Sequence, residues 1–233
     1  ENTLIDINNL AFKIDNNPFK TNARIKNLTT NPKVNGSLKC TLNLDDLSKV
    51  YPMDASNTMR GLVVADVTSS FDVAAIQNNT YQRIKSTGHI AVSNFKYTSE
   101  DIVNPIQINS TKINFQPGKV NLTNFDATTG TTDLNATGTI DNLLGFLLSD
   151  KNLKGNFSVS SKRFSVGDFM EKSEDNTTEN PEESLKIPAF LECTINASAA
   201  TVLYDNLALK EVKGILILKN EKANNQLLKS NKI

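Results

Sequence analysis

Apolar and polar residues alternate with a period of two along most of this chain. From Val34 to Leu44 the even positions are apolar or small, and Asn, Ser, Lys and Thr occupy the odd positions between them. Odd positions are apolar or small in the same way over 63–75 and 191–199. Successive side chains on a β-strand point to opposite faces, so each run predicts a strand with one apolar and one polar wall. The runs exceed the usual strand length of about 5–6 residues, and a wet face is typical of antiparallel sheets.

Helical signals are few. Residues 45–50, which begin with two Asp and precede Pro52, predict one short helical turn with an Asp cap and a Pro stop. Residues 142–148 form the most apolar segment and predict a short amphipathic helix or a buried bend. Seven residues cannot span a bilayer, which needs about 20. We expect this segment to close the rim of the core, and a surface that touches a partner or a membrane is the alternative.

Glycine recurs in the pattern x-Gly-x-apolar. The pattern contains six of the ten glycines: Gly36, Gly61, Gly88, Gly138, Gly155 and Gly214. The first three are 25 and 27 residues apart, which predicts a repeated hairpin unit of about 25 residues. Glycine within a strand usually marks a bulge or bend. These positions therefore predict regular curvature of a long sheet, unless glycine simply begins strands here as in any β protein.

The composition restricts the function classes. The chain has 233 residues, which fits one large all-β unit or two ordinary domains. Its 25 basic and 25 acidic residues cancel, which argues against nucleic-acid partners and against simple attraction to an anionic membrane. The hydrophobic share of 38% is below the usual globular share of about 45–50%. Alternation accounts for this low value, because half of each strand faces water.

One acidic stretch divides the predicted sheet. Residues 171–186 contain six acidic residues and no aromatic residue, which predicts a flexible linker or a long loop. We expect residues 1–170 to form the curved antiparallel sheet and residues 187–219 to add further strands to it. Residues 220–233 are polar, and we expect them to form a tail.

The residues give no catalytic, metal-binding or cofactor-binding constellation. His89 is the single histidine, whereas a His-based zinc site needs two or three; we expect it to be an exposed strand residue. No P-loop, nucleophile elbow or dinucleotide-binding motif is present. Cys40 and Cys193 lie on apolar positions and predict buried free thiols, although a disulfide between them stays open at this stage. We therefore expect a protein that is not an enzyme and holds no metal or cofactor.

Several segments, taken in order, resemble bacterial AsmA-like proteins. They are VNGSLKCTLNLDDLSKVYP (34–52), PGKVNLTNFD (117–126), DLNATGTIDNL (133–143), LKGNFSVSS (153–161) continuing to 168–170, and YDNLALKEVKG (204–214). The resemblance covers nearly the whole chain apart from the acidic stretch. The Asn-rich composition, with 31 Asn, is similar to members of the family from Bacteroidetes-type bacteria.

This resemblance implies a periplasmic protein of the cell envelope. Members of the family are related to TamB, are anchored in the inner membrane by an N-terminal helix that this sequence does not contain, and have no catalytic residues to transfer. They share a long, strongly curved, taco-like β-sheet of repeated hairpins, and are implicated in lipid transport and outer-membrane biogenesis. The implied partners are a phospholipid or another envelope lipid, and envelope proteins.

The apolar strand positions are the candidate lipid-groove residues. They are Leu38, Cys40, Leu42, Val63, Ala65, Val67, Phe71, Val73, Ile90, Val92, Phe157, Val159, Cys193, Ile195, Leu216 and Leu218. Alternation alone also fits a closed core, so a structural module that supports outer-membrane protein assembly is the alternative. A third hypothesis, a secreted β-sandwich or solenoid adhesin or enzyme, would require aromatic residues or carboxylates that converge on one rim.

Overall fold

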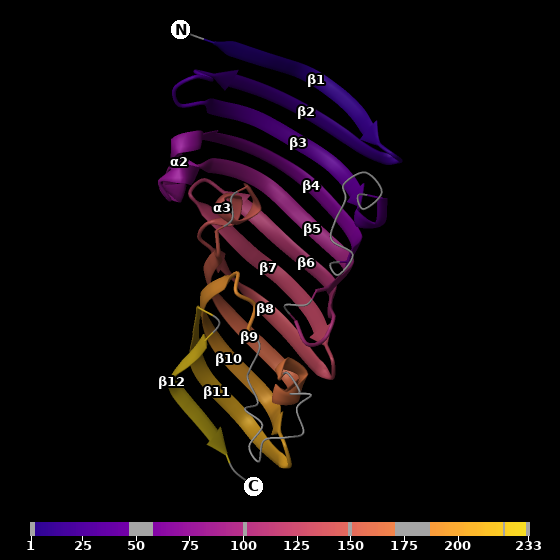
Figure 1. Cartoon of the computed structure of the whole chain (residues 1–233), viewed down its shortest axis with the longest axis vertical. Coiled ribbons are helices and arrows are strands. Elements are labelled where there is room, and N and C mark those ends of the chain that lie inside the picture. The colour runs from indigo at the N-terminus through magenta and orange to yellow at the C-terminus, as the bar shows by residue number, and fades with distance from the viewer. Residues whose placement is uncertain are drawn as a thin grey trace, which may run out of the picture.

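The chain forms a single open β-sheet. A computed structural model describes residues 3–46, 58–99, 102–148, 151–170, 187–220 and 222–231. These residues contain a sheet of 12 strands in which each strand lies beside its neighbours in sequence. The two chain termini lie at opposite ends of the sheet (Figure 1). The predicted all-β class is therefore confirmed.

The strands are long, as the alternating runs predict, and the helices are short. The first six strands are β1 (Leu4–Ile14), β2 (Asn17–Lys26), β3 (Lys33–Asn43), β4 (Thr58–Asp72), β5 (Lys85–Thr98) and β6 (Ile106–Gln116). The others are β7 (Lys119–Thr129), β8 (Thr132–Ile140), β9 (Leu153–Ser165), β10 (Leu191–Tyr204), β11 (Leu207–Lys219) and β12 (Lys222–Asn231). The helices are α2 (Val73–Gln77) and α3 (Leu143–Leu148), with 3₁₀ turns η1 (Tyr81–Arg83) and η2 (Val166–Phe169).

Every strand pair is antiparallel except β9 and β10, which are parallel. The expectation of a purely antiparallel sheet is wrong for this pair. Because the two strands are parallel, β9 ends at one rim of the sheet and β10 begins at the other, the rim where β9 also begins. The acidic stretch 171–186 belongs to the connection between them and lies outside the described residues.

The sequence boundaries hold in part. Strands β10 and β11 continue the sheet, as predicted for residues 187–219. The apolar segment 142–148 contains α3, as predicted, and a helical turn begins at 44–46, beyond which residues 47–57 are not described. The expectation of a tail at 220–233 is wrong, because β12 pairs with β11 from Lys222 to Asn231. An edge strand is held by backbone hydrogen bonds, which polar residues make as well as apolar ones.

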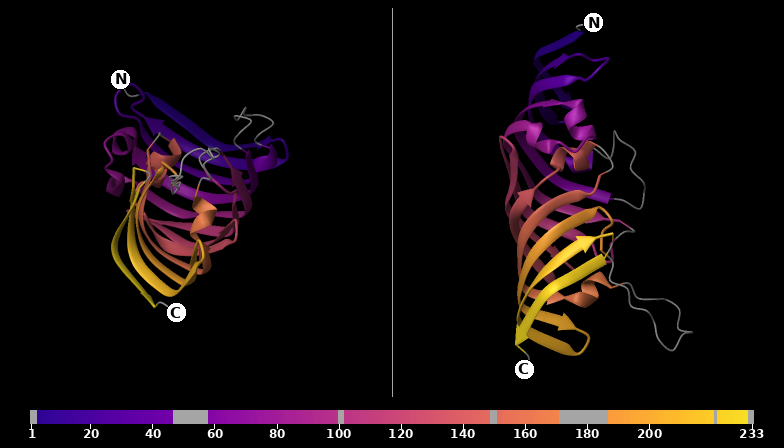
Figure 2. Two further views of the ribbon diagram at one scale, coloured as in Figure 1. Left: turned by 60° about the horizontal axis from the view of Figure 1, so that its bottom comes forward. Right: turned by 90° about the vertical axis from the view of Figure 1, so that its left-hand side faces the viewer.

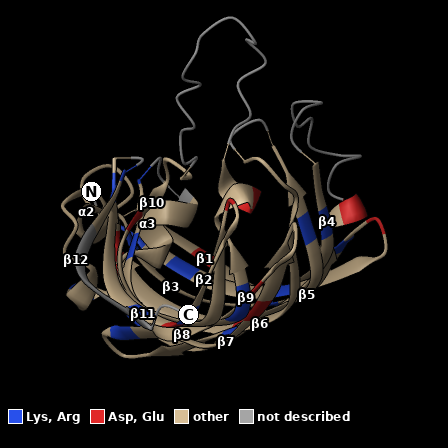
Figure 3. Ribbon diagram, turned by 90° about the horizontal axis from the view of Figure 1, so that it is seen from below, with Lys and Arg blue, Asp and Glu red and all other residues tan. Residues whose placement is uncertain are grey.

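The sheet is bent into an open trough. Each strand curves across the trough, and the strands stack along its length (Figure 2). The view along the trough shows a U-shaped cross-section with α3 inside it (Figure 3). We call the rim that carries α2, η1 and α3 the helix rim. Strands β4, β6 and β8 end there, and η2 and the β7–β8 turn lie at the opposite rim.

The apolar face of the sheet is the concave one. Leu143 of α3 packs in one cluster with Phe115, Leu122 and Ile140 of β6, β7 and β8. Because α3 lies inside the trough (Figure 3), the strand residues that it contacts must also point inward. Residues directly paired across a sheet lie on the same face, so the register extends this assignment to every strand.

Glycine and β-bulges accompany the curvature. Gly61 and Gly88 have φ of +126° and +109°, a backbone region that disfavours side chains. Gly61 lies at the register shift between Arg60 and Leu62, which changes the direction of the first residues of β4. Gly36, Gly61 and Gly88 lie on the consecutive strands β3, β4 and β5. The 25-residue spacing is therefore one strand with its connection, and the predicted hairpin unit of that length is wrong.

Asparagine supplies most of the other left-handed backbone positions. Among the residues that the structure describes, eight non-glycine residues have positive φ, and five of them are asparagines: Asn9, Asn27, Asn79, Asn94 and Asn220. Asn9 lies within the register shift of β1, and the others lie in turns or at a strand irregularity. A short amide side chain tolerates this conformation better than other non-glycine side chains. The Asn-rich composition is thus partly a consequence of many turns and bulges.

The convex face carries ion pairs between neighbouring strands. Lys39 and Asp66 occupy directly paired positions, with 2.8 Å between Nζ and Oδ2. Arg24 pairs with Asp6 in the same way at 2.6 Å. Solvent screens exposed pairs of this kind, so they contribute little to stability. Because opposite charges face each other across neighbouring strands, the convex face can carry many charged residues without strong repulsion between like charges.

We predict that Gly138→Ala destabilises the sheet. A Cβ at Gly138 would lie 2.8 Å from Cδ1 of Phe157 and still closer to the Asn156 carbonyl oxygen, which belongs to the backbone and cannot yield. Overpacking of this kind costs about 1–3 kcal/mol of unfolding free energy, measurable by urea denaturation. Gly167→Ala is the control, since its Cβ would meet nothing closer than 3.8 Å. Equal stability of the two variants would refute this account of the glycine.

We also predict an acid-sensitive contribution from Asp133. Burial alone would raise the pKa of this carboxyl, but backbone N–H groups of Lys162 and Arg163 donate to Oδ1 at 3.0 and 2.8 Å, and the net effect lowers the pKa below 3.8. The stabilisation is present at neutral pH and is lost as the pH falls through the lowered pKa. Asp133→Asn should cost about 1 kcal/mol at neutral pH, and this difference in unfolding free energy should shrink below about pH 4. A difference that stays constant with pH would contradict the prediction.

Candidate functional site: a concave apolar groove

One row of side chains crosses eleven strands of the concave face. Following the paired positions from β1 to β11, this central row contains Phe12, Phe19, Cys40, Ala65, Ile90, Ile113, Leu122, Gly138, Phe157, Ile195 and Leu216. Each member is apolar or glycine. Strands lie about 4.8 Å apart, so twelve strands give a groove roughly 50 Å long.

A second row runs parallel to it, one step toward the helix rim. It contains Leu10, Thr21, Leu38, Val67, Gly88, Phe115, Val120, Ile140, Gly155, Cys193 and Leu218. Its polar member Thr21 donates its hydroxyl to the Ser37 carbonyl oxygen at 2.8 Å. Thr111, also on the concave face, donates to the Asn124 carbonyl oxygen at 2.8 Å. These two hydroxyls are therefore bonded within the sheet and leave the rows around them apolar.

The glycines in these rows make room for aromatic rings. Phe157 lies so close to Gly138 and Gly155 that a Cβ at either position would be 2.8 Å from its ring. The ring thus covers two glycines on adjacent positions, an arrangement that stabilises glycine within a sheet. The repeated pattern x-Gly-x-apolar has this physical basis on β9.

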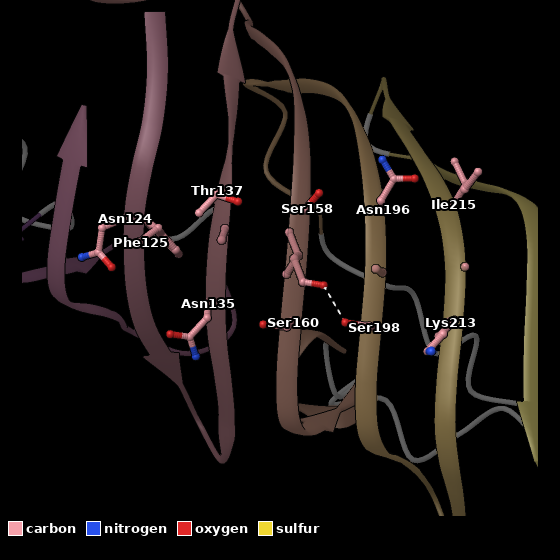
Figure 4. A pocket seen from close by; sticks show the side chains of 14 residues that line it. Asn124, Phe125, Asn135, Thr137, Ser158, Ser160, Asn196, Ser198, Lys213 and Ile215 are labelled. Carbon is pink, nitrogen blue, oxygen red and sulfur yellow. Dashed lines mark hydrogen bonds between the residues drawn. The ribbon is translucent and has the colours of Figure 1, made fainter. Parts of the chain in front are cut away.

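A hollow of about 690 Å³ lies against strands β7 to β11. Its lining is mostly polar and includes Asn135, Thr137, Ser158, Ser160, Asn196 and Ser198 (Figure 4). These residues flank the concave positions Ala136, Val159 and Ala197 along their strands, so their side chains point to the opposite face of the sheet. The hollow therefore lies on the polar, convex face and is not part of the apolar groove.

The groove candidates share one face, with one exception. Fifteen of the sixteen lie on strands at positions that the register connects to the concave face. Val73 does not, because β4 ends at Asp72 and Val73 begins α2. Asp72 caps this helix by accepting from the Ala75 N–H at 3.0 Å, and the Val73 N–H donates to the Pro32 carbonyl oxygen at 2.9 Å. The inclusion of Val73 among the groove positions is therefore wrong.

Sequence reasoning missed the groove residues of β1, β2 and β6 to β8. Bulges interrupt the alternation on β1, β6 and β7, although β2 and β8 alternate regularly. The concave positions of β7 change from even at Leu122 to odd at Ala127 across a register shift. Strand β6 changes in the same way between Ile108 and Ser110. The missed residues could have been found by allowing one extra residue at Asn, which marks the bulges of β1 and β5.

Cys40 and Cys193 are buried free thiols, as the sequence predicts. They lie on β3 and β10, so their separation along the sheet is roughly 30 Å. A disulfide requires Cα atoms about 4.4–6.8 Å apart. An intramolecular disulfide is therefore incompatible with this fold.

Other kinds of site are not evident among the described residues. No cluster of three or more His, Cys, Asp or Glu that could hold a metal ion occurs in this part of the chain. None of the helices described is long and apolar enough to cross a membrane. No known protein family, curated protein or solved structure matches the chain.

We predict that both thiols react slowly in the native protein. Burial raises the pKa of Cys193 from 9.0 to about 11, and burial also raises that of Cys40. About 100-fold less Cys193 thiolate is then present near pH 8. Alkylation by iodoacetamide, followed by mass spectrometry, should be much slower in buffer than in urea. Ser160→Cys, at an exposed position, provides a fast-reacting control, and native thiols that react as fast as this control would contradict the prediction.

Proposed function

We propose that the trough is a lipid-binding groove, a segment of an AsmA-like envelope protein along which acyl chains move between membranes. The continuous apolar central row on the concave face supports this proposal most strongly. Periplasmic location, an inner-membrane anchor outside this sequence and a role in outer-membrane biogenesis belong to the same proposal. They rest on the resemblance of the sequence motifs.

The chemistry of the concave wall matches an acyl chain. A 16-carbon chain gains on the order of 13 kcal/mol when it leaves water, so it does not cross an aqueous space bare at a useful rate. An acyl chain occupies half of a hydrocarbon core about 30 Å thick, or roughly 15 Å. A groove roughly 50 Å long holds several such lengths end to end. The Thr21 and Thr111 hydroxyls are bonded to backbone carbonyl groups of the sheet, so they offer a sliding acyl chain no specific contact to break.

The one-layer architecture favours this function over a closed structural module. A closed core needs a second layer, and among the described residues only the helix-rim elements pack onto the concave face. Apolar residues of the central row such as Ile90, Ile113 and Phe157 consequently remain partly exposed. An apolar wall of this length without a covering layer needs a ligand or a partner.

Lipid binding is tested by Ile195→Glu. Ile195 lies in the central row outside the buried clusters, so a carboxylate there should repel acyl chains and leave the fold intact. Native mass spectrometry of protein purified gently from its own host should show phospholipid on the unmodified chain and at least about fivefold less on Ile195→Glu. Thr194→Glu, on the convex side of the same strand, should keep its lipid. Lipid-free native protein, or equal loss in both variants, would refute the proposal.

A further inference from the structure

A separate pocket lies where the concave face meets the helix rim. It has a volume of about 450 Å³, within the range of ligand sites. Three segments surround it: η1 with the start of β5, the β6–β7 turn, and the end of β8 with α3.

The floor of the pocket is apolar and continuous with the groove. Phe115, Val120 and Ile140 belong to the second row, and Leu143 of α3 packs against the same cluster. Leu144 packs on the other buried cluster, beside α2 and Ile84. The two adjacent leucines of α3 thus join both clusters and form one side of the pocket.

A network of contacts keeps the helical side of the pocket in place. Gly145 lies directly against the Tyr81 ring, where any Cβ would collide with it. The Tyr81 hydroxyl donates to Oδ1 of Asn79 at 2.8 Å, and Lys151 Nζ donates to the same atom at 2.8 Å and to the Ile76 carbonyl oxygen at 2.8 Å. Buried Asn142 accepts from the Lys154 N–H at 2.7 Å and donates to the Asn152 carbonyl oxygen at 2.6 Å. The pocket is therefore preformed.

The mouth of the pocket is polar and carries one charge of each sign. Val120 and Ile140 are directly paired where β7 begins and β8 ends, at the helix rim. Lys119 and Asp141 are the next residues toward the rim on these two strands, so both lie at that end of the strand pair. Both are exposed and both line the pocket, together with Gln82 and Gln116. An apolar floor beneath a mouth with one cation and one anion matches an amphiphile whose polar end is dipolar.

We propose that this pocket binds the head-group end of a zwitterionic glycerophospholipid, with its phosphate toward Lys119 and its ammonium toward Asp141. The acyl chains then continue over Phe115 and Ile140 into the groove. This inference rests on the proposed function, because it assigns the lipid class and the position of the head group at the helix rim. Lys119 and Asp141 together carry no net charge. The pocket mouth therefore attracts a head group of net negative charge less strongly than a purely basic site would.

Introduced tryptophans test the position, since the chain has no Trp of its own. Gln82→Trp reports on the pocket mouth, Val159→Trp on the concave groove, and Thr194→Trp on the convex face. Each variant is loaded from vesicles of phospholipid brominated either near the ester or near the methyl end, then separated from the vesicles. We expect Gln82→Trp to be quenched at least twofold more by the ester-proximal bromine, Val159→Trp by either lipid, and Thr194→Trp by neither.

Charge variants test the head-group class. With vesicles of phosphatidylethanolamine, Lys119→Glu should lower the bound lipid per protein at least fivefold, whereas Lys112→Glu, an equal charge change at an exposed position on β6, should have no effect. Phosphatidylglycerol should bind the unmodified chain several-fold less. Circular dichroism verifies that each variant is folded.

The outcomes separate the two proposals. Quenching of Val159→Trp without quenching of Gln82→Trp overturns the rim site and leaves the groove function standing. Absence of quenching in both overturns the groove function itself. Equal binding of the two lipid classes, or equal effects of Lys119→Glu and Lys112→Glu, overturns the zwitterionic assignment.

Discussion

The backbone hydrogen-bond ladder between sequence neighbours is the interaction on which the whole structure depends. Each strand pairs only with the strands before and after it, and the described residues contain no second sheet to pack against. Cohesion therefore comes from the ladder and from side chains that touch within one face. This arrangement is quasi-one-dimensional, so it can be extended without changing its cross-section.

The ladder also explains why curvature and side-chain size are coupled. Bending a sheet brings the side chains of its inner face together, so the concave rows need small residues at intervals. Gly138 and Gly155 beneath Phe157 show this relation directly. Bulges at Asn9 and Asn94 shift the face that each strand presents and keep apolar residues inward along strands too long for regular pleating.

The same geometry relates the fold to the proposed function. A sheet that cannot cover its own apolar face presents a continuous surface to acyl chains, and a polar head group must then stay at a rim in contact with water. The helix rim is where the structure supplies polar groups next to that surface. Lys119 and Asp141 lie there beside a floor that belongs to the second row.

Alternation in the sequence alone determined the strands, their wet and dry faces, the all-β class and the short helix at α3, because side-chain direction has a period of two in any strand. It failed wherever long-range pairing intervenes. Hydrogen bonds to partners distant in the chain decide the parallel β9–β10 pair, the polar edge strand β12, the bulge-shifted residues of β6 and β7, and the helical position of Val73. Only the tertiary structure decided that the dry face is concave and uncovered within the described residues, because local alternation is identical in a trough and in a closed core.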